Sequence, residues 1–204
     1  MSFDSKKEIV KFLGENGVFN LQGREKIIRT CRLVSCIPWG EGRTLEEVLV
    51  TKKVGTCTGK HLVLQACLDE IGIRYRPVVC TFRWGDQCIK YTPSLRAILK
   101  KGEWEHGHNF VQIEREDGIY LDVDITWNPK LKPYGFRTFP EDWNGKTPFV
   151  GVEKIVRRWD CADIASMKKE LTEYLPPDVR ERREHFLREF ISWVDSINKS
   201  RKIT

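Results

Sequence analysis

The stretch from Gly55 to Gly72 constrains the fold of this 204-residue chain more than any other part of it. It opens with Gly-Thr-Cys-Thr-Gly-Lys-His (55–61) and continues as an almost unbroken apolar run. A helix over this run is apolar on nearly all sides, which is typical of a helix buried in the middle of a domain. Gly72 stands where a glycine ends a helix. Apolar side chains surround this predicted helix: Leu62, Val63, Leu64, Ala66, Cys67, Leu68 and Ile71.

Cys57 falls at the N-terminus of this predicted helix. Free backbone N–H groups and the positive end of the helix dipole lower the pKa of a thiol there and stabilise the nucleophilic thiolate. A lone cysteine is more often a buried structural residue, so position alone leaves both interpretations open. We interpret the following cysteines as core or incidental thiols: Cys31, Cys67, Cys80, Cys88 and Cys161.

Composition describes a globular chain of one domain, with room for helical extensions. Hydrophobic residues make up 40% of it, with seven Trp and ten Phe, which is enough to build a core. The seven cysteines form no repeated Cys-x-x-Cys unit, and the first thirty residues are charged throughout. Together these features predict a cytoplasmic protein with reduced thiols. No run approaches the ~18 apolar residues of a membrane span, so no membrane partner is expected.

The net charge of +6 is modest and is concentrated near the C-terminus. Such a cluster is typical of a solvated helix face, and no aromatic-interleaved RNA motif accompanies it. We therefore expect no nucleic-acid partner, and the sequence leaves the oligomeric state open. The basic residues concerned are Arg180, Arg182, Arg183, Lys199, Arg201 and Lys202.

Two predicted strands, 109–115 and 119–125, flank Glu116-Asp117-Gly118, which is typical of a three-residue hairpin loop closed by a glycine bulge. In this register, the numbers of any two residues that lie directly opposite each other add up to 234. A slip by one residue would set apolar residues opposite polar ones. His108 and Asp124 therefore share one face, diagonal to each other and within side-chain reach. The other face is apolar, with Val111, Ile113, Ile119, Leu121, Val123 and Ile125.

The rest of the chain gives shorter signals. Helices are expected within 9–13, 24–36 and 94–101, and one is opened by a Thr44–Glu47 capping box. Residues 75–82 predict a strand. Residues 133–148 predict an irregular loop in which Phe139 and Trp143 line the wall of a cleft, and an edge strand is expected within 150–159. Helices follow over 163–174 and 178–198, the second with an apolar face that we expect to dock on the core.

Cys57, His108 and Asp124 offer the three roles of a thiol catalyst. A thiolate needs a base that takes and returns a proton near neutral pH, and imidazole does this. A carboxylate fixes the tautomer of the imidazole and stabilises the imidazolium. We therefore expect a Cys-His-Asp triad.

These motifs resemble the transglutaminase-like superfamily. The family pattern runs Gly-x-Cys, a helix, Gly-Ile and an Arg, and the chain matches it with Gly55, Cys57, Lys60, Gly72, Ile73 and Arg76. Residues 108–110 match the His-x-aromatic motif of the family. Residues 124–126 match its Asp-x-Thr motif, and Tyr120 stands four residues before Asp124. The resemblance covers about residues 39–127. It implies an α+β, papain-like fold in which the Cys-bearing helix packs on an antiparallel sheet that carries His and Asp. The chain would then be one domain, 1–204, with an N-terminal helical extension and a C-terminal one over about 160–204.

The resemblance implies an enzyme that forms an acyl-enzyme at Cys57 and hydrolyses or transfers an amide or peptide acyl group, without a cofactor or a metal. Its substrate would be a peptide, or a small amide or thioester. Two alternatives stay open: a catalytically inactive domain that serves as a binding module, and a small-molecule acyltransferase that uses a thioester donor. The missing Cys-x-x-Cys pairs separate the chain from the zinc-bearing peptide N-glycanases, and a missing Arg-rich glycine segment separates it from the arylamine acetyltransferases.

Three further residues are candidates for oxyanion or substrate contacts. The indole N–H of Trp39 would complete an oxyanion hole with the Cys57 backbone N–H, although a packing aromatic is the alternative. His61 stands where the family usually has a small residue, and it would crowd the site, tune the thiol or pack on the helix. His106 is expected at the rim. A rival interpretation is a metal site of His106 and His108 with Asp122 or Asp124.

Overall fold

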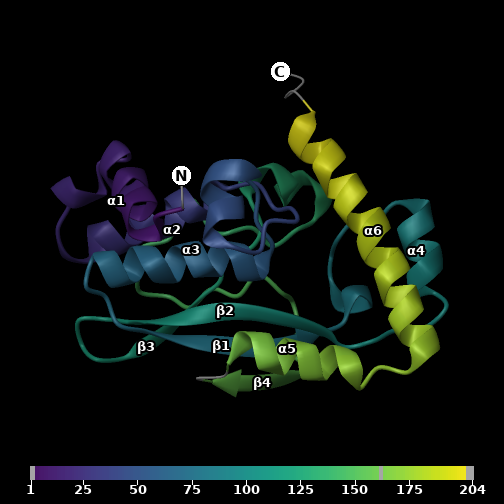
Figure 1. Ribbon diagram of the computed structural model, residues 1–204. Helices are drawn as coiled ribbons and strands as arrows, with labels where there is room; N and C mark the ends of the chain where they lie inside the picture. Colours follow the sequence, from purple (N-terminus) through teal and green to yellow (C-terminus); the bar gives the residue numbers. More distant parts are fainter. Residues whose placement is uncertain (1–2, 161–162, 201–204) are drawn as a thin grey trace.

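The computed structural model describes residues 3–160 and 163–200, and within them the chain is an α+β protein built on one antiparallel sheet (Figure 1). The strand order is β3-β2-β1-β4. Its strands are β1 (Tyr75–Phe82), β2 (His106–Glu114), β3 (Tyr120–Val123) and β4 (Arg157–Asp160). Its α-helices are α1 (Ser5–Glu15), α2 (Gly23–Cys36), α3 (Cys57–Glu70), α4 (Pro93–Leu99), α5 (Ile164–Glu173) and α6 (Pro177–Lys199). Short helical turns are η1 (Val18–Asn20), η2 (Glu47–Thr51), η3 (Trp84–Asp86) and η4 (Pro129–Tyr134).

The central helix α3 confirms the prediction from the Gly55 to Gly72 stretch. It begins at Cys57, and the Thr56 hydroxyl caps it by accepting a hydrogen bond from the Gly59 N–H at 3.1 Å. Gly72 follows its end with a φ of +71°, a left-handed conformation that glycine adopts without strain. The helix packs against α1, α2 and β2 (Figure 1).

The hairpin register is the predicted one. Val111 lies opposite Val123 and Ile113 opposite Leu121, so opposed numbers sum to 234. Gly118 adopts a φ of +80° in the three-residue loop, and the Arg115 N–H donates to the Ile119 carbonyl at 2.9 Å. The prediction that Ile119 shares the buried apolar face was wrong: Ile119 is 57% exposed, because it lies in the loop before β3 begins at Tyr120.

The strand β3 ends at Val123, two residues earlier than predicted. The Asp124 N–H donates to the Phe149 carbonyl at 3.0 Å, and the Phe149 N–H donates to the Asp122 carbonyl at 2.8 Å. A distant segment therefore replaces the strand β2 as the partner of the chain at Asp124. Residues 157–160 pair with the other edge of the sheet as β4, which confirms an edge strand although it is shorter than the predicted segment.

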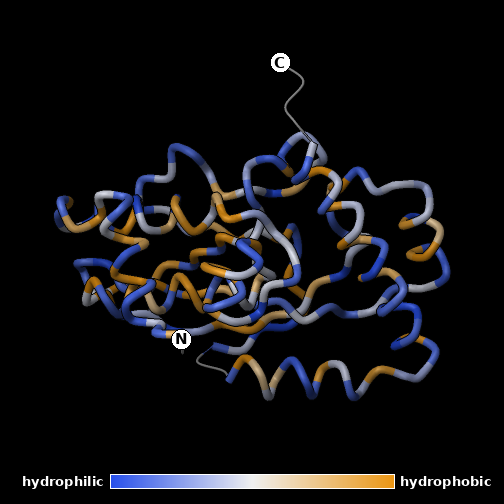
Figure 2. The backbone as a smooth tube through the Cα atoms, turned by 45° about the horizontal axis from the view of Figure 1, so that its top comes forward, coloured by the Kyte–Doolittle hydropathy of each residue, from blue (hydrophilic) through white to orange (hydrophobic). Residues whose placement is uncertain are grey.

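Two large hydrophobic clusters and a small one of Val78, Cys80 and Phe110 form the core, and Figure 2 shows hydrophobic segments concentrated inside a largely hydrophilic outline. The first joins α1, α2 and α3 to the odd-numbered residues of β2 and β3. Phe139 and Trp143 belong to this cluster, at 4% exposure each. Each also lines a surface pocket, as the prediction of a cleft wall implies, but neither pocket includes Cys57. The second cluster joins α4 and α6 to the end of β1 and to the buried residues Trp39, Trp84, Trp104 and Trp127.

The C-terminal helix α6 docks on the second cluster as predicted, through its buried face of Phe186, Phe190, Val194 and Ile197. The Thr44–Glu47 capping box is present, with the Glu47 N–H donating to the Thr44 hydroxyl at 3.2 Å. The segment after it differs from the prediction, since it continues as the π-helical turn η2. Among the described residues, no helix is long and apolar enough to cross a membrane. Cys161, Arg201 and Lys202 lie outside the described residues.

Candidate active site

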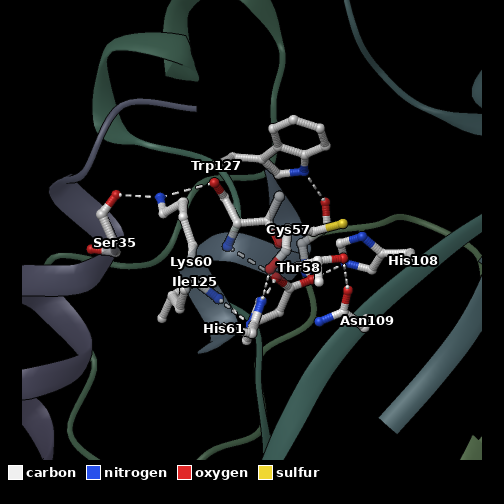
Figure 3. A network of polar contacts seen from close by, with 12 residues as sticks. Ser35, Cys57, Thr58, Lys60, His61, His108, Asn109, Ile125 and Trp127 are labelled. Atoms are coloured by element: carbon white, nitrogen blue, oxygen red, sulfur yellow. Dashed lines mark hydrogen bonds and ion pairs between the residues drawn. The ribbon is translucent and has the colours of Figure 1, made fainter. Parts of the chain in front are cut away.

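The half-buried thiol of Cys57 lies at the first residue of α3, close to the imidazole of His108 (Figure 3). The ammonium group of Lys168 also contacts the sulfur. These groups come from three separate elements, α3, β2 and α5. At the start of a helix the first backbone N–H groups have no intrahelical partner. The sulfur therefore lies at the positive end of the helix and beside two groups that are able to carry a positive charge.

His108 and Asp124 are in direct contact, as their shared face predicts. His108 Nε2 donates to Asp124 Oδ2 at 2.7 Å, and both side chains are buried. The contact fixes the imidazole tautomer, because Nε2 carries the proton in either charge state. Nδ1 is then the ring nitrogen left to exchange a proton with the Cys57 thiol.

The Asp124 carboxylate is itself held in place by main-chain donors. The Thr126 N–H donates to Oδ1 at 3.0 Å and the Gly151 N–H donates to Oδ2 at 2.8 Å. A side chain at Gly151 would crowd Asp124, since an added Cβ would lie 3.0 Å from Oδ2. Burial would raise the pKa of Asp124, but the charge and hydrogen bond of His108 hold it well below its usual range. The carboxylate is thus ionised throughout the ordinary pH range.

The charges on Cys57 and His108 stabilise each other. Burial would raise the pKa of the Cys57 thiol, but the Lys168 cation and His108 outweigh it and lower that pKa to about 5. Burial would lower the pKa of His108, but Asp124 and Cys57 outweigh it and raise that pKa to about 9. Between these two values the site holds a thiolate and an imidazolium. Such a pair is the reactive form of a cysteine nucleophile.

The other buried thiols differ from Cys57. Burial raises the pKa of Cys67 to about 12, and it also raises the pKa of Cys31 and of Cys80. These three cysteines lie in the core and are protonated at neutral pH, which agrees with their interpretation as structural thiols.

Lys168 is the member of the site that the sequence did not reveal. Its Nζ lies 3.2 Å from Cys57 Sγ, and it donates to Thr58 Oγ1 at 2.9 Å and to Asn109 Oδ1 at 2.6 Å. The Thr58 hydroxyl donates to the same Asn109 oxygen at 3.0 Å. The ammonium group is therefore fixed in front of the sulfur by two neutral acceptors and by the thiolate itself.

His61 is fully buried behind the site. Its Nδ1 bonds to the Cys57 carbonyl at 2.8 Å, and its Nε2 accepts from the Ile125 N–H at 3.3 Å. Burial lowers the pKa of His61 to about 4, so the ring is neutral and joins α3 to the segment that follows β3. This placement agrees with packing among the three roles considered for His61. It gives no support to an oxyanion or substrate contact.

Lys60 is a buried cation within the apolar helix. Its Nζ donates to the carbonyls of Ser35 and Thr126, at 2.9 Å each. Burial lowers the pKa of Lys60 to about 7. The residue ties three segments together just behind Asp124, since Thr126 is also the donor that holds the carboxylate.

Trp39 and His106 both lie in aromatic surroundings. Trp39 packs on Trp127 and Phe190, with ring centroids 5.5 Å and 5.3 Å away. Its backbone pairs with Gly55, two residues before Cys57, and its role as an oxyanion donor stays a prediction. His106 packs against Trp84, with centroids 5.0 Å apart, and is half-buried, and its place at the rim of the site stays a prediction.

The contacts of the acidic residues leave the rival metal site unsupported. Asp122 accepts from both terminal nitrogens of Arg158, at 2.7 and 2.8 Å, and Asp124 is committed to His108. Within residues 3–160 and 163–200, no three His, Cys, Asp or Glu side chains converge as metal ligands. Asp122 is thus an ion-paired strand residue and not a second acid at Cys57.

Some of these residues carried a sequence signal and others carried none. Lys60 is a charged residue within an apolar helix, and Asn109 directly follows His108 in the strand. The sequence pattern could therefore have indicated both residues. Lys168 lies in a polar helix more than a hundred residues from Cys57, and nothing in its neighbourhood distinguishes it from other surface lysines.

No protein-family model matches the chain, and no curated protein matches it in sequence. The functional inference therefore rests on the chemistry of the Cys57 cluster.

Proposed function

We propose that this chain is a cysteine-nucleophile enzyme of the transglutaminase-like type, which forms an acyl-enzyme at Cys57 and passes the acyl group to water or to an amine. The observation that carries the proposal is the cluster of thiol, imidazole and carboxylate at the start of a buried helix, with His108 and Asp124 at 2.7 Å. The substrate class is an amide, a peptide or a thioester.

The first step is attack of the Cys57 thiolate on the carbonyl carbon of the substrate. The backbone N–H at the start of α3 is positioned to stabilise the oxyanion that forms, because it has no partner within the helix. The tetrahedral intermediate collapses when His108 Nδ1 donates its proton to the leaving amine or thiolate. In the second step the neutral imidazole takes a proton from the water or amine that attacks the thioester.

Asp124 orients the imidazole throughout both steps and stabilises its charged form. It remains ionised, because His108 and main-chain donors hold its pKa low. These steps require no metal and no organic cofactor, since thiolate, imidazole and carboxylate supply the nucleophile, the acid–base group and its orienting partner.

The architecture supports the family part of the proposal. A helix that begins at the cysteine packs on an antiparallel sheet whose adjoining strands lead to the histidine and the aspartate. This is the arrangement that the resemblance over residues 39–127 implies. Transglutaminase-like membership and the triad roles are both part of this proposal.

The proposal is tested by detecting the covalent acyl-enzyme intermediate. The protein is incubated with panels of peptide amides and acyl thioesters, with hydroxylamine as a competing acceptor, and Cys57 is examined by peptide mapping. Without hydroxylamine we expect an acyl adduct formed through Cys57, and with hydroxylamine we expect hydroxamate in solution. Both should be lost in Cys57→Ala and retained in the matched variants Cys36→Ser and Cys88→Ser, whose cysteines are exposed. Turnover that survives in Cys57→Ala would contradict the proposal. Absence of any adduct over broad panels would favour the binding-module alternative.

A further inference from the structure

The contact between Lys168 and Cys57 places a primary amine where an acyl group must arrive. Nζ lies 3.2 Å from Sγ, so it is in contact with the atom that carries the acyl group in the proposed intermediate. The reacting atoms of a transfer would be Nζ and the acyl carbonyl carbon, which is bonded directly to Sγ. An amine in contact with Sγ therefore lies within about one bond length of the near-attack separation of about 3–3.5 Å between reacting atoms.

The position of the amine is built by the protein. Asn109 and Thr58 each accept a hydrogen bond from Nζ, and both belong to the elements that carry His108 and Cys57. The stem of Lys168 runs over Gly107, where an added Cβ would lie 3.5 Å from its Cγ and 3.4 Å from Leu171 Cδ1. The missing side chain between His106 and His108 therefore lets α5 approach the strand closely.

The helix that carries Lys168 is otherwise weakly attached. None of its residues is buried, and it lies along the sheet at the strands β1 and β2 (Figures 1 and 2). The amine is thus able to adjust its position over a newly formed thioester without unpacking a core.

We propose that Lys168 is an internal acyl acceptor: the acyl group carried by Cys57 is transferred to Lys168 Nζ, and the enzyme acylates itself at this lysine. The inference rests on the proposed function, since it needs the thioester at Cys57. Its donors are activated acyl compounds, with thioesters foremost.

The step balances as an S-to-N acyl transfer. Formation of the thioester removes the negative charge of the thiolate, which leaves the Lys168 ammonium with two neutral acceptors. The ammonium loses one proton to solvent, and the amine attacks the thioester carbonyl carbon. As the carbon–nitrogen bond forms, the second proton passes to His108 Nδ1, and the carbon–sulfur bond breaks to release the thiolate. The products are an amide at Lys168 and a restored thiolate–imidazolium pair.

The outcome for the enzyme is a change of charge at its own site. An acylated Lys168 has no cation, and its acyl chain occupies the space in front of Cys57. Because an amide is not hydrolysed under conditions that cleave a thioester, each transfer limits later turnover by that molecule.

The probe for the test is the acetyl thioester of N-acetylcysteamine, which is small enough to reach a half-buried sulfur. The wild-type protein, Cys57→Ala, Lys168→Arg and Lys169→Arg are incubated with it and divided in two. One half is treated with hydroxylamine, which removes acetyl from sulfur but not from nitrogen, and acetyl groups are located by peptide mapping. Lys169 is the matched control, because it is the adjacent lysine of the same helix with a 75% exposed side chain.

In the wild-type protein and in Lys169→Arg we expect hydroxylamine-resistant acetyl on Lys168. From the effective molarity of a held amine, this label should exceed that on wild-type Lys169 by about tenfold or more. In Lys168→Arg the label should instead accumulate as hydroxylamine-labile acetyl on Cys57, and in Cys57→Ala the label on Lys168 should fall to the level of Lys169.

Three results would overturn the inference. Labile acetyl on wild-type Cys57 without acetyl on Lys168 would refute the transfer and leave the proposed function intact. Equal acetylation of Lys168 in Cys57→Ala would show direct chemical modification by the thioester. Absence of acetyl from both residues in every variant would count against the proposed function and, with it, against the transfer.

Discussion

The helices α3 and α5 both bring a reactive group to the same sulfur, but they are attached to the protein in different ways. α3 has seven buried residues, a capped start and a glycine stop, and it packs against α1, α2 and the sheet. α5 has a capped start as well, through Asp163, but it has no buried residue. The nucleophile is therefore set on a rigid element and the cation on a weakly held one.

This difference separates two kinds of residue at the site. His108 and Asp124 are fixed by buried hydrogen bonds, and Cys57 is held at the first residue of the packed helix α3. Lys168 is fixed mainly by its own polar contacts with the site. Changes on the rigid side should remove activity or stability, whereas changes on the α5 side should tune the chemistry and leave the fold intact.

The largest effect is expected at Asp124. Asp124→Asn keeps the shape of the side chain but removes the charge that stabilises the His108 imidazolium, and turnover should fall by about 10⁴-fold, as for the equivalent change in serine proteases. Steady-state kinetics with a substrate from the panels measures it. Asp122→Asn is the matched control, since this carboxylate pairs with Arg158. Equal losses in the two variants would contradict the assignment.

Core truncations compare the two helices directly. Leu64 of α3 is fully buried, so Leu64→Ala should lower the free energy of unfolding by about 2–5 kcal/mol. Leu171 of α5 is only half-buried, and Leu171→Ala should cost less than about 1 kcal/mol. Urea unfolding followed by circular dichroism measures both. Similar losses for the two variants would mean that α5 is as firmly packed as α3.

Lys60 adds a pH dependence to the rigid side. Its pKa is lowered from 10.5 to about 7, so between these values the unfolded chain binds a proton that the folded chain does not. Stability conferred by Lys60 should therefore rise with pH across this window and be lowest below pH 7.

The matched comparison is with Lys60→Met, which leaves the carbonyls of Ser35 and Thr126 without their donor. Each unpaired group costs about 1–3 kcal/mol, so the variant should be less stable than wild type at high pH, and the gap should narrow as the pH falls toward 7. Urea unfolding at several pH values measures this. A gap that is the same at every pH would contradict a lowered pKa for Lys60.

The smallest effect is expected on the α5 side. Lys168→Met removes the cation beside Cys57, so the pKa of the thiol should rise and the midpoint of its alkylation should move to higher pH. A shift of one pKa unit would reduce the thiolate about tenfold at low pH, while the melting temperature should stay close to that of wild type. Lys169→Met controls for the loss of a surface charge. An unchanged alkylation profile in Lys168→Met would show that the cation does not act on the thiol.

The sequence predicted the rigid side of the site well because its signals are local. The apolar run after Gly59 predicted α3, and the alternation around Gly118 predicted the register that brings His108 to Asp124. What it missed depends on contacts between distant segments. The end of β3 at Val123 depends on hydrogen bonds with Phe149, and the place of Lys168 depends on how α5 lies across the strand at Gly107. Neither contact has a periodicity or spacing that a single sequence displays.

The central claim is that Cys57 is a thiolate held between His108 and Lys168, and its most direct test is the rate of iodoacetamide alkylation at each cysteine as a function of pH, followed by mass spectrometry. With a pKa of about 5 for Cys57 and about 9 for His108, labelling of Cys57 should begin near pH 5 and hold a plateau over the range between these values. Cys36 and Cys88, which are exposed, serve as the internal comparison. Preferential labelling of another cysteine, or a Cys57 that reacts only above about pH 8 like an ordinary thiol, would contradict the account.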